Sequence, residues 1–436
     1  MPHLWCLEGR VRTCGLICSL IRIGNIDLEL AEGETNMQVY EIKKDVFWVG
    51  AVDWLVRDFH GYSTYKGSTY NAYLMLDEKN VLFDTVKHNL CSDLVHRIRT
   101  VMDPEKIDYI VVNHVEMDHT GSLPKIVEMV KPEKIICSKM GHKNLLSHFH
   151  RPDWPYHIIE NNESISVGKR TIQFMETRML HWPDSMFSYI PEEKLLISQD
   201  AFGQHLGTSE RFDDEVDLSE LMYQAKKYYA NIIYLYAPQV RKLLEHVAEI
   251  NLDVDMIAPD HGVIWRTHID KILKAYQDWS NHKATNKAIV VYDTMWHSTE
   301  MMAKAIADGI ESTGTSMQLL DLSVNHRSDV IAELLDAKGI CLGCPTLNNG
   351  LLPRMAGYLM YMKGLRPAKK FGAAFGSFGW SGESVKHMNK AMEEMKFELI
   401  HDGLKVKYVP THDDLKKCWE LGRLMGEKVQ EAVDKQ

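Results

Sequence analysis

The sequence predicts an α/β protein with two domains, preceded by a short N-terminal extension. Short β-rich runs alternate with helical patterns along most of the 436 residues. The character of the strands changes near residue 284, because the run KAIVVYD (287–293) is continuously apolar, as in a parallel strand covered on both faces. A chain of this length also exceeds one ordinary hydrophobic core.

The first 36 residues lack the periodicity of a helix or strand. The apolar run CGLICSLI (14–21) follows two arginines, which is a feature of secretory signals, but Arg22 interrupts it and no small-residue cleavage site follows. We therefore expect residues 1–36 to be an extension with little fixed structure, and the folded protein to begin at Met37.

Residues 37–283 are expected to form the first domain, an α/β sandwich. The predicted strands are VFWVGAV, NAYLML, NVLFDT, IDYIVV, KIICS, TIQFME, LLISQ and DMIAP, and the predicted helices span 91–102, 121–130 and 218–249. Strands on both sides of helices favour layered packing. A further helix from residue 267 runs into a polar linker.

Residues 284–436 are expected to form the second domain, an open, doubly wound parallel sheet. Its predicted strands are KAIVVYD, GICLG, FGAAFG and LKVKYV, and its predicted helices span 298–312, 383–396 and 413–432.

Composition excludes several classes of function. Sixty acidic against 50 basic residues give a net charge of -10, which disfavours a nucleic-acid partner. No run reaches the roughly 18 apolar residues of a membrane helix. Eight scattered cysteines in a large chain indicate a reducing compartment, so we expect a cytoplasmic protein. The single CxxC, Cys341 and Cys344, cannot supply a four-cysteine metal site, and we expect both to be buried apolar residues.

A cluster of possible metal ligands follows the apolar strand IDYIVV. His114, Glu116, Asp118 and His119 lie within six residues, where a strand end can direct them at one volume. A solvated polar turn is the plain alternative. Three further polar residues interrupt apolar surroundings downstream, namely His181, Asp200 and His261.

This ordered set of residues resembles the flavodiiron proteins, or A-type flavoproteins, from Met37 to the C-terminus. The resemblance implies a metallo-β-lactamase-like αββα sandwich followed by a flavodoxin-like domain. It also implies two irons, bridged by oxo or hydroxo and by carboxylate, with these ligands: His114, Glu116 and His181 for one, Asp118, His119 and His261 for the other, and Asp200 between them. In some members the counterpart of His119 does not contact the metal.

The chemistry of the ligands also favours iron. Zinc hydrolases of this fold have histidine where this chain has Glu116, and carboxylates mixed with imidazoles suit iron. Manganese or zinc stays an alternative. Each site histidine needs an outer acceptor, for which Asp184, Asp260 and Asn113 are candidates. His60 and His205 are either neighbours of the centre or structural histidines.

Three loops in the second domain predict an FMN site. The hydroxyl-rich loop after KAIVVYD opens a helix and offers free N–H groups to a phosphate, although an ordinary capping loop is the alternative. It resembles the flavodoxin phosphate loop, with His297 where many relatives have glycine. The expected contacts are Thr294, Met295, Trp296, His297, Ser298 and Thr299; Pro345, Thr346, Leu347, Asn348, Asn349 and Gly350; and Ser377, Phe378, Gly379, Trp380, Ser381 and Gly382. Asn and Gly tolerate positive φ near a flavin, and Trp380 either covers the ring or only packs.

The resemblance implies reduction of O2 to water, and of NO to N2O, with electrons from rubredoxin or a flavin reductase. It further implies a head-to-tail homodimer or a dimer of dimers, in which each flavin faces the other subunit's irons. Two alternatives remain: a zinc hydrolase with an appended flavodoxin domain, and a non-catalytic flavin electron carrier. The sequence does not choose between O2 and NO.

Overall fold

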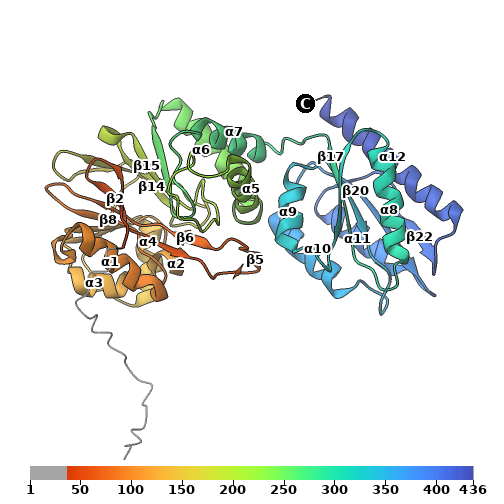
Figure 1. The fold of residues 1–436 in the computed structure, drawn as a ribbon, viewed down its shortest axis with the longest axis horizontal. Helices are drawn as coiled ribbons and strands as arrows, with labels where there is room; N and C mark the ends of the chain where they lie inside the picture. The colour runs from red at the N-terminus through yellow and green to blue at the C-terminus, as the bar shows by residue number, and fades with distance from the viewer. Residues whose placement is uncertain (1–36, 436) are drawn as a thin grey trace, which may run out of the picture. The chain divides into compact units, whose positions relative to one another are not determined.

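The computed structural model describes residues 37–435, and the expected extension, residues 1–36, lies outside the described residues (Figure 1). Three main sheets organise the described chain. Two belong to residues 40–259 and the third to residues 287–407. The expected domain boundary at 283/284 falls between the helix that ends at Ser280 and the strand that begins at Lys287.

The first two sheets pack face to face. The seven-stranded sheet has the order β1 (Tyr40–Lys43), β2 (Val46–Trp48), β7 (Tyr73–Met75), β8 (Val81–Phe83), β9 (Tyr109–Val112), β10 (Lys134–Cys137), β11 (Tyr156–Ile158). The five-stranded sheet has the order β12 (Ser164–Ser166), β13 (Thr171–Glu176), β14 (Met186–Ile190), β15 (Leu195–Gln199), β16 (Met256–Pro259). One buried cluster joins them, with Trp48 and Phe83 from the first sheet against Phe174 and Ile197 from the second. This apolar layer is the centre of the sandwich.

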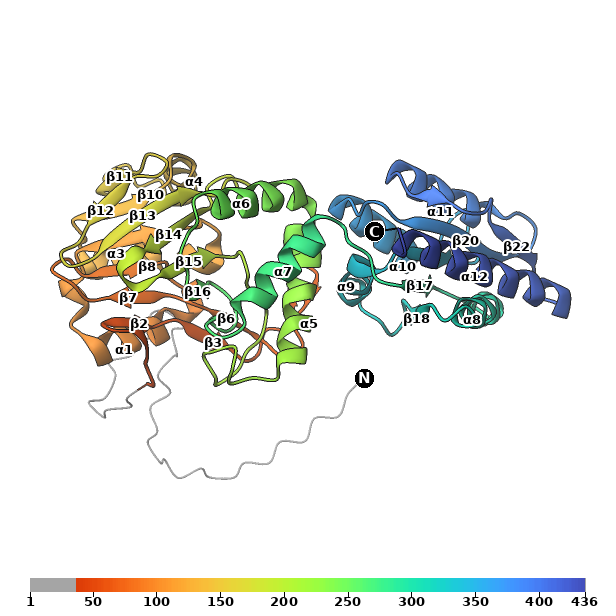
Figure 2. The same cartoon turned by 90° about the horizontal axis from the view of Figure 1, so that it is seen from above.

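Helices cover both outer faces of this sandwich (Figures 1 and 2). They are α1 (Cys91–Val101), α2 (Met117–Thr120), α3 (Leu123–Val130), α4 (Lys139–Phe149), α5 (Leu218–Tyr228), α6 (Ala237–Glu249) and α7 (Ile269–Ser280), with short 3-10 turns η1 (His88–Leu90), η2 (Pro104–Lys106) and η3 (Pro191–Glu193). α1 and α3 pack on the seven-stranded sheet, and α5 and α7 pack on the five-stranded sheet. The expected αββα sandwich is therefore confirmed.

Two sequence-based boundaries in this sandwich were wrong. The run VFWVGAV is not one strand, because the chain turns at Gly50 from β2 into β3 (Ala51–Asp53), which pairs with β6 (Ser68–Tyr70) in a separate sheet. A Cβ at Gly50 would lie 2.3 Å from the carbonyl oxygen of Tyr70, so only glycine allows this approach. The helix expected over 218–249 is interrupted by a π-helical turn, η4 (Tyr229–Ile233), and a 3-10 turn, η5 (Tyr234–Tyr236). Pro238 lies in the first turn of α6, where proline is tolerated.

The third sheet is parallel and doubly wound, as expected. Its order is β18 (Ser316–Asp321), β17 (Lys287–Tyr292), β19 (Gly339–Gly343), β20 (Phe371–Phe378), β21 (Glu398–Leu399), and β22 (Leu404–Lys407) also pairs with β20. Its helices are α8 (Ser298–Glu311), α9 (Arg327–Asp336), α10 (Pro353–Leu365), α11 (Glu383–Glu394) and α12 (His412–Val433). The sequence patterns did not single out β18, whose residues are half-exposed, so it lacks a continuous apolar run.

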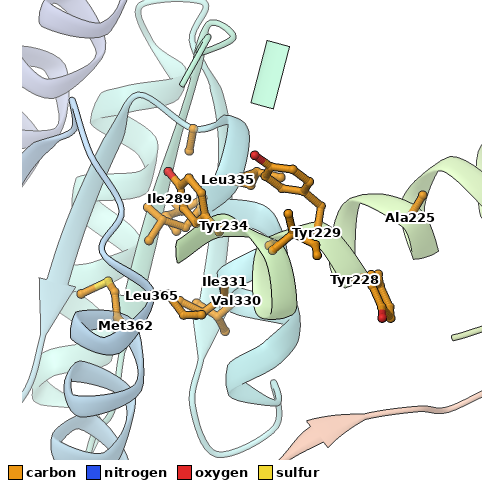
Figure 3. Packing of buried hydrophobic residues seen from close by; sticks show 14 of the residues in the cluster. Ala225, Tyr228, Tyr229, Tyr234, Ile289, Val330, Ile331, Leu335, Met362 and Leu365 are labelled. Atoms are coloured by element: carbon orange, nitrogen blue, oxygen red, sulfur yellow. The ribbon is translucent and has the colours of Figure 1, made fainter. Parts of the chain in front are cut away.

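A second cluster continues from the sandwich into the third sheet. Tyr229 and Tyr234, from the interrupted helical segment, pack with residues of β17, α9 and α10, including Ile289, Val330 and Met362 (Figure 3). The two halves of the described chain therefore share apolar core. Among residues 37–435, no helix combines the length and hydropathy that a membrane span requires.

Candidate metal and flavin sites

The seven expected metal ligands converge at strand ends of the sandwich. The segment 114–119 leaves the carboxyl end of β9, and α2 turns Asp118 and His119 inward. The others come from the five-stranded sheet: His181 from the β13–β14 loop, Asp200 from the end of β15 and His261 from the end of β16. Carboxyl ends of parallel strands meet at one edge, so distant segments reach one volume.

The ligand atoms form two adjoining groups. In the first group, His114, Glu116, His181 and Asp200 have ligand atoms within 4.8 Å of one another. His181 Nε2 lies 2.8 Å from Asp200 Oδ2 and 3.3 Å from Glu116 Oε2. The second group holds Asp118, His119 and His261, with both Nε2 atoms 3.4 Å from Asp118 oxygens. Such separations are those of neighbouring ligands that are each about 2 Å from one ion.

Asp200 faces both groups. Its Oδ2 lies 3.6 Å from His114 Nε2 and 2.8 Å from His181 Nε2, on the first side. Its Oδ1 lies 3.2 Å from His119 Nε2 and 3.3 Å from His261 Nε2, on the second side. One carboxylate thus offers one oxygen to each of two positions, which is the geometry of a bridge.

The donor set fits metal ions. Within the described residues, several buried atoms of the site make no hydrogen bond: both carboxylate oxygens of Asp118, both ring nitrogens of His119, and Oδ1 of Asp200. Buried polar atoms of this kind are costly unless another partner satisfies them. A cation shared between the carboxylates and imidazoles would supply that partner.

Hydrogen bonds behind the site hold the imidazoles in place. His114 Nδ1 lies 3.0 Å from Asp184 Oδ2, and Asp184 also accepts from the N–H of Val115 and from Asn144. His261 Nδ1 lies 2.8 Å from the carbonyl oxygen of Thr69. These contacts direct Nε2 of each ring into the site.

The other two outer candidates are placed differently. Asp260 Oδ2 lies 3.5 Å from His119 Nδ1. Asn113 bonds Asp84 and Ser188 rather than a site histidine. The tautomer of His119 is therefore less firmly fixed than that of His114.

The electrostatic field of the site favours positive charge. Burial acts to lower the pKa of His261, yet Asp118 and Asp200 raise it to about 10. Burial also acts to lower the pKa of His119, yet the neighbouring carboxylates raise it to about 9. Burial acts to raise the pKa of Glu116, but His114 and His181 lower it to about 2. A site that stabilises charge in this way attracts cations.

A cleft of about 730 Å³ leads to the expected metal ligands. It is lined by Asp58, Phe59, His60, Lys87, Glu116, Met117, Asp118 and Trp182. Sequence reasoning missed Phe59, Lys87 and Trp182 as wall residues. The signal for Lys87 was its place just after β8, beside β9 at the same sheet edge. Phe59 adjoins His60 in a two-residue strand, and Trp182 adjoins His181 in the β13–β14 loop, but neither segment carries a separate sequence pattern.

Both histidines that the sequence left open lie near the metal ligands. His60 Nε2 is 3.6 Å from Glu116 Oε1, and its side chain is 77% exposed at the cleft. His205 is buried against His261, with ring centroids 4.8 Å apart, and its Nδ1 lies 2.7 Å from Ser68 Oγ. Burial and the charge of His261 lower the pKa of His205. His205 is thus a neutral packing neighbour of a ligand.

The three expected flavin loops enclose one pocket of about 710 Å³. It lies at the carboxyl ends of β17, β19 and β20, where doubly wound sheets bind ligands. The lining comprises Met295, Trp296 and Ser298; Pro345, Thr346, Leu347, Asn348 and Asn349; Ser377, Phe378, Gly379, Trp380 and Ser381; and Tyr408 and Val409. Sequence reasoning missed Tyr408 and Val409, which are the last two residues of the expected strand LKVKYV and lie just beyond β22.

Five expected contact residues do not line this pocket. Thr299 is buried and bonds Ser377 Oγ at 3.0 Å, which ties two of the loops together. His297 caps α8 with φ 66°, and Gly382 caps α11 with φ 158°. Gly350 closes a turn with Leu347. The fifth, Thr294, has a buried Oγ1 without a hydrogen-bond partner among the described residues.

The phosphate loop fits an anion. The left-handed φ of His297 explains why glycine suits this position. α8 begins with Ser298 and Thr299, so its first N–H groups and the orphaned hydroxyl of Thr294 are available to a phosphate. Trp296 and Trp380 are 86% and 88% exposed beside the pocket, where an aromatic ring system would cover part of them.

Comparison with known protein families supports both halves of this description. Residues 69–262 match the family described as ODP family beta lactamase, and residues 290–422 match the family described as flavodoxin.

Similar proteins extend over nearly the whole described chain. A nitric oxide reductase of Moorella thermoacetica is 45% identical over 395 residues, which are 90% of this chain and 99% of that protein. A rubredoxin-oxygen oxidoreductase of Megalodesulfovibrio gigas is 47% identical over 381 residues, or 87% of this chain and 95% of that protein. The solved structure of the flavodiiron protein from Giardia intestinalis matches with TM-score 0.90 and 34% identity, covering 92% of this chain and 99% of that one.

Proposed function

This chain belongs to the flavodiiron protein family, and on that premise we propose that it reduces O2 to water and NO to N2O. Electrons would pass from a rubredoxin-type donor through FMN to a pair of iron ions. The observation that carries the proposal is the placement of Asp200, whose two oxygens face two separate groups of ligands. Two of its relatives are named for NO and O2 reduction, so both substrates are proposed.

The residues would divide the iron site as follows: His114, Glu116 and His181 for one ion, Asp118, His119 and His261 for the other, and Asp200 for both. Carboxylate at Glu116, in place of the imidazole of zinc hydrolases, adds a hard ligand that suits iron. When bound, the iron pair would supply and store electrons for the small substrate, and FMN would relay them singly or in pairs. Asp184 and the Thr69 carbonyl keep two imidazoles turned inward.

In the second domain, the chain would bind and orient FMN through the loops after β17, β19 and β20. Thr294, Ser298 and the N-terminus of α8 would hold the phosphate. Asn348 and Asn349 line the pocket with φ of 50° and 57°, a left-handed conformation that would let the backbone approach a flavin ring. Trp380 would cover the ring and shield it from water.

We further propose a head-to-tail homodimer, alone or paired into a dimer of dimers. Large apolar side chains are exposed at both sites: Met117 in the metal cleft, and Trp296, Trp380, Tyr408 and Val409 at the flavin pocket. Trp54 and Leu55 are also exposed, in the segment that leads to Asp58 of the cleft wall. Exposed apolar patches of this kind mark interaction sites. A dimer that joins the two patches would bring each flavin to the irons of its partner.

A cytoplasmic location is part of the proposal. The five described cysteines, Cys91, Cys137, Cys341, Cys344 and Cys418, are free and buried, as in a reducing compartment. Burial raises the pKa of Cys341 to about 12, so this thiol is not poised for redox chemistry. A zinc hydrolase with an appended flavin domain is not favoured by the family relationship.

The test is the substitution Glu116→His, which converts the ligand set toward that of zinc hydrolases. We expect loss of O2 and NO consumption with reduced rubredoxin, while FMN content stays at the wild-type level. The matched control is Glu105→His, at an exposed position of η2. Wild-type protein that contains zinc alone, or a Glu116→His variant with full activity, would contradict the proposal.

A further inference from the structure

A short hairpin forms one wall of the metal cleft. It consists of β4 (Asp58–Phe59) and β5 (Tyr62–Ser63), and Asp58, Phe59 and His60 line the cleft. The Phe59 ring lies 5.2 Å from His205 and 6.4 Å from His261, measured between centroids. His60 reaches Glu116. The position of this hairpin therefore sets the width of the cleft above the ligands.

The hairpin is too short to hold its own position. Its ladder pairs only Asp58 with Ser63 and Phe59 with Tyr62. His60 and Gly61 form the turn with φ of 54° and 83°, the left-handed values of a tight two-residue hairpin turn. An isolated two-stranded hairpin is marginally stable in water. Contacts from elsewhere must fix it.

Those contacts come from the first turn of α9, in the flavodoxin-like half of the chain. The N–H of Ser63 donates to Ser328 Oγ at 3.1 Å, and the two serine hydroxyls lie 2.9 Å apart. Just beyond the hairpin, the Tyr65 hydroxyl donates to Asp329 Oδ2 at 2.8 Å. Gly61 packs so closely on this turn that a Cβ would lie 2.4 Å from Arg327 Nη2.

A buried lysine on α5 completes the attachment. Lys227 Nζ donates to the carbonyl oxygen and the hydroxyl of Ser63, both at 2.8 Å, and lies 2.5 Å from Asp329 Oδ1. Its side chain is 1% exposed. A buried ammonium that loses its carboxylate is strongly unfavourable, so this arrangement holds as a unit.

We propose that Lys227, Ser328 and Asp329, here termed the α9 latch, are positioning residues for the metal site. They fix the hairpin that carries Phe59 and His60 and so define the cleft through which O2 or NO reaches the irons. None of the three lines the cleft. The effect on access of O2 or NO rests on the proposed function, whereas the fixing of the hairpin by the α9 latch does not.

The structural part is tested by hydrogen–deuterium exchange of the full-length, metal- and FMN-loaded protein. Ser328→Ala removes the acceptor of the Ser63 N–H, and Asp329→Asn removes the charge that pairs with Lys227. We expect amides of residues 58–63 to exchange on the order of ten-fold faster in both variants, because local opening becomes easier. The matched control is Lys226→Met, which breaks the 2.7 Å pair with Asp336 between the same two helices without touching the hairpin. It should leave exchange at 58–63 unchanged.

The functional part is tested by steady-state kinetics on the same proteins. We expect kcat/KM for O2 to fall on the order of ten-fold, mainly through KM, because the cleft wall is no longer held. Iron and FMN contents should equal those of the wild type, and Lys226→Met should behave as the wild type does.

The outcomes separate the two claims. Unchanged exchange at 58–63 in Ser328→Ala overturns the latch, even if Asp329→Asn fails to fold. Faster exchange with unchanged KM overturns its role in positioning the site. If the wild-type protein consumes neither gas, the proposed function fails, whereas the exchange comparison still decides whether the latch holds the hairpin.

Discussion

Asp184 is the residue on which the orientation of His114 depends. It is buried, and its carboxylate accepts from three donors: the His114 ring, the Val115 N–H and Asn144. We predict that Asp184→Asn weakens iron binding by about 10–100-fold. The NH2 group of asparagine would face one of the N–H groups from which Asp184 now accepts, and the negative charge that strengthens the imidazole as a ligand would be lost. Iron retained against a chelator, measured beside FMN content, checks this.

The control for that experiment is Asp153→Asn. Asp153 pairs with Arg151 at the surface, with its side chain 61% exposed, and should leave iron retention unchanged. FMN content should be the same in all three proteins. Equal iron retention in Asp184→Asn and the wild type would mean that the ring of His114 is held by other contacts.

Lys370 makes the stability of the fold depend on pH. Its ammonium is buried and donates to the carbonyl oxygens of Leu335 and Ala337 at 2.9 and 2.5 Å. Burial, with smaller contributions from neighbouring lysines, lowers its pKa from 10.5 to about 7. Between these two values the unfolded chain binds more protons than the folded chain, so the free energy of unfolding rises with pH across this window.

We predict that Lys370→Met removes that dependence. Urea unfolding at pH 7 and pH 9 should show the wild type gaining stability relative to Lys370→Met as pH rises. The comparison between the two proteins cancels the titration of other groups. Parallel pH dependences in the two proteins would show that Lys370 carries an ordinary pKa.

Whether the role of a single residue could be predicted from the sequence depended on its distance from a recognisable strand. The expected metal ligands His114, Asp200 and His261 stand within two residues of an apolar strand. The interruption of the pattern marked them, although it could not show that they meet. Lys87 stands four residues beyond β8, and Tyr408 is part of the expected strand LKVKYV, so neither could be assigned to a site without the sheet order. Ser328 and Lys227 have no pattern, because their role comes from a contact with Ser63, 265 and 164 residues away.

At the scale of elements, α8 and α12 are packed backbone against backbone. A Cβ at Gly422 would lie 2.0 Å from the carbonyl oxygen of Ile306, and one at Gly309 would lie 2.0 Å from that of Trp419. At both glycines an added Cβ would clash with main-chain atoms, so no side-chain movement could relieve the clash. The two glycines therefore set the distance between the helices.

We predict that Gly422→Ala destabilises the flavodoxin-like domain by about 3 kcal/mol, since the helices must separate to admit the methyl group. Thermal unfolding followed through FMN release would measure this. Gly357→Ala in α10 is the matched control, because a Cβ there meets nothing within 4 Å. It should stabilise the protein by up to about 1 kcal/mol through helix propensity. Equal melting temperatures for the two variants would refute the close packing.

Elements were predictable where their residues are uniformly buried or strictly periodic. TIQFME, LLISQ and GICLG form strands with the expected bounds. The segment 218–249 has helical periodicity throughout. The chain nevertheless changes from α-helix to a π-helical turn and then a 3-10 turn where Tyr229 and Tyr234 pack against the second half of the chain. Periodicity does not encode such a change.

At the scale of the whole molecule, the two halves are joined by a half-buried ion pair as well as by apolar core. Lys226 of α5 pairs with Asp336 of α9 across the junction, and Lys287 of β17 pairs with Asp336 and Glu333 within the second half. Asp336 has two lysine partners, so it keeps one ion pair when the other lysine is lost. The halves of one chain are therefore held together firmly, yet within the described residues the metal cleft and the flavin pocket share no lining residue. The two sites therefore have no common wall in one chain, and we expect electrons to pass between chains in the proposed dimer.

Mixed dimers test that route directly. One chain carries Glu116→His, which disables its metal site, and the other carries Ser298→Glu, which places a negative charge where the FMN phosphate would bind. Purified through two different tags, this dimer should keep about half of the wild-type activity, because one flavin still faces an intact metal site across the interface. The reciprocal dimer pairs a wild-type chain with a chain that carries both substitutions. It should be inactive, since each intact site then faces a disabled one. If electrons passed within a chain, the two results would be exchanged, and the head-to-tail arrangement would have to be abandoned.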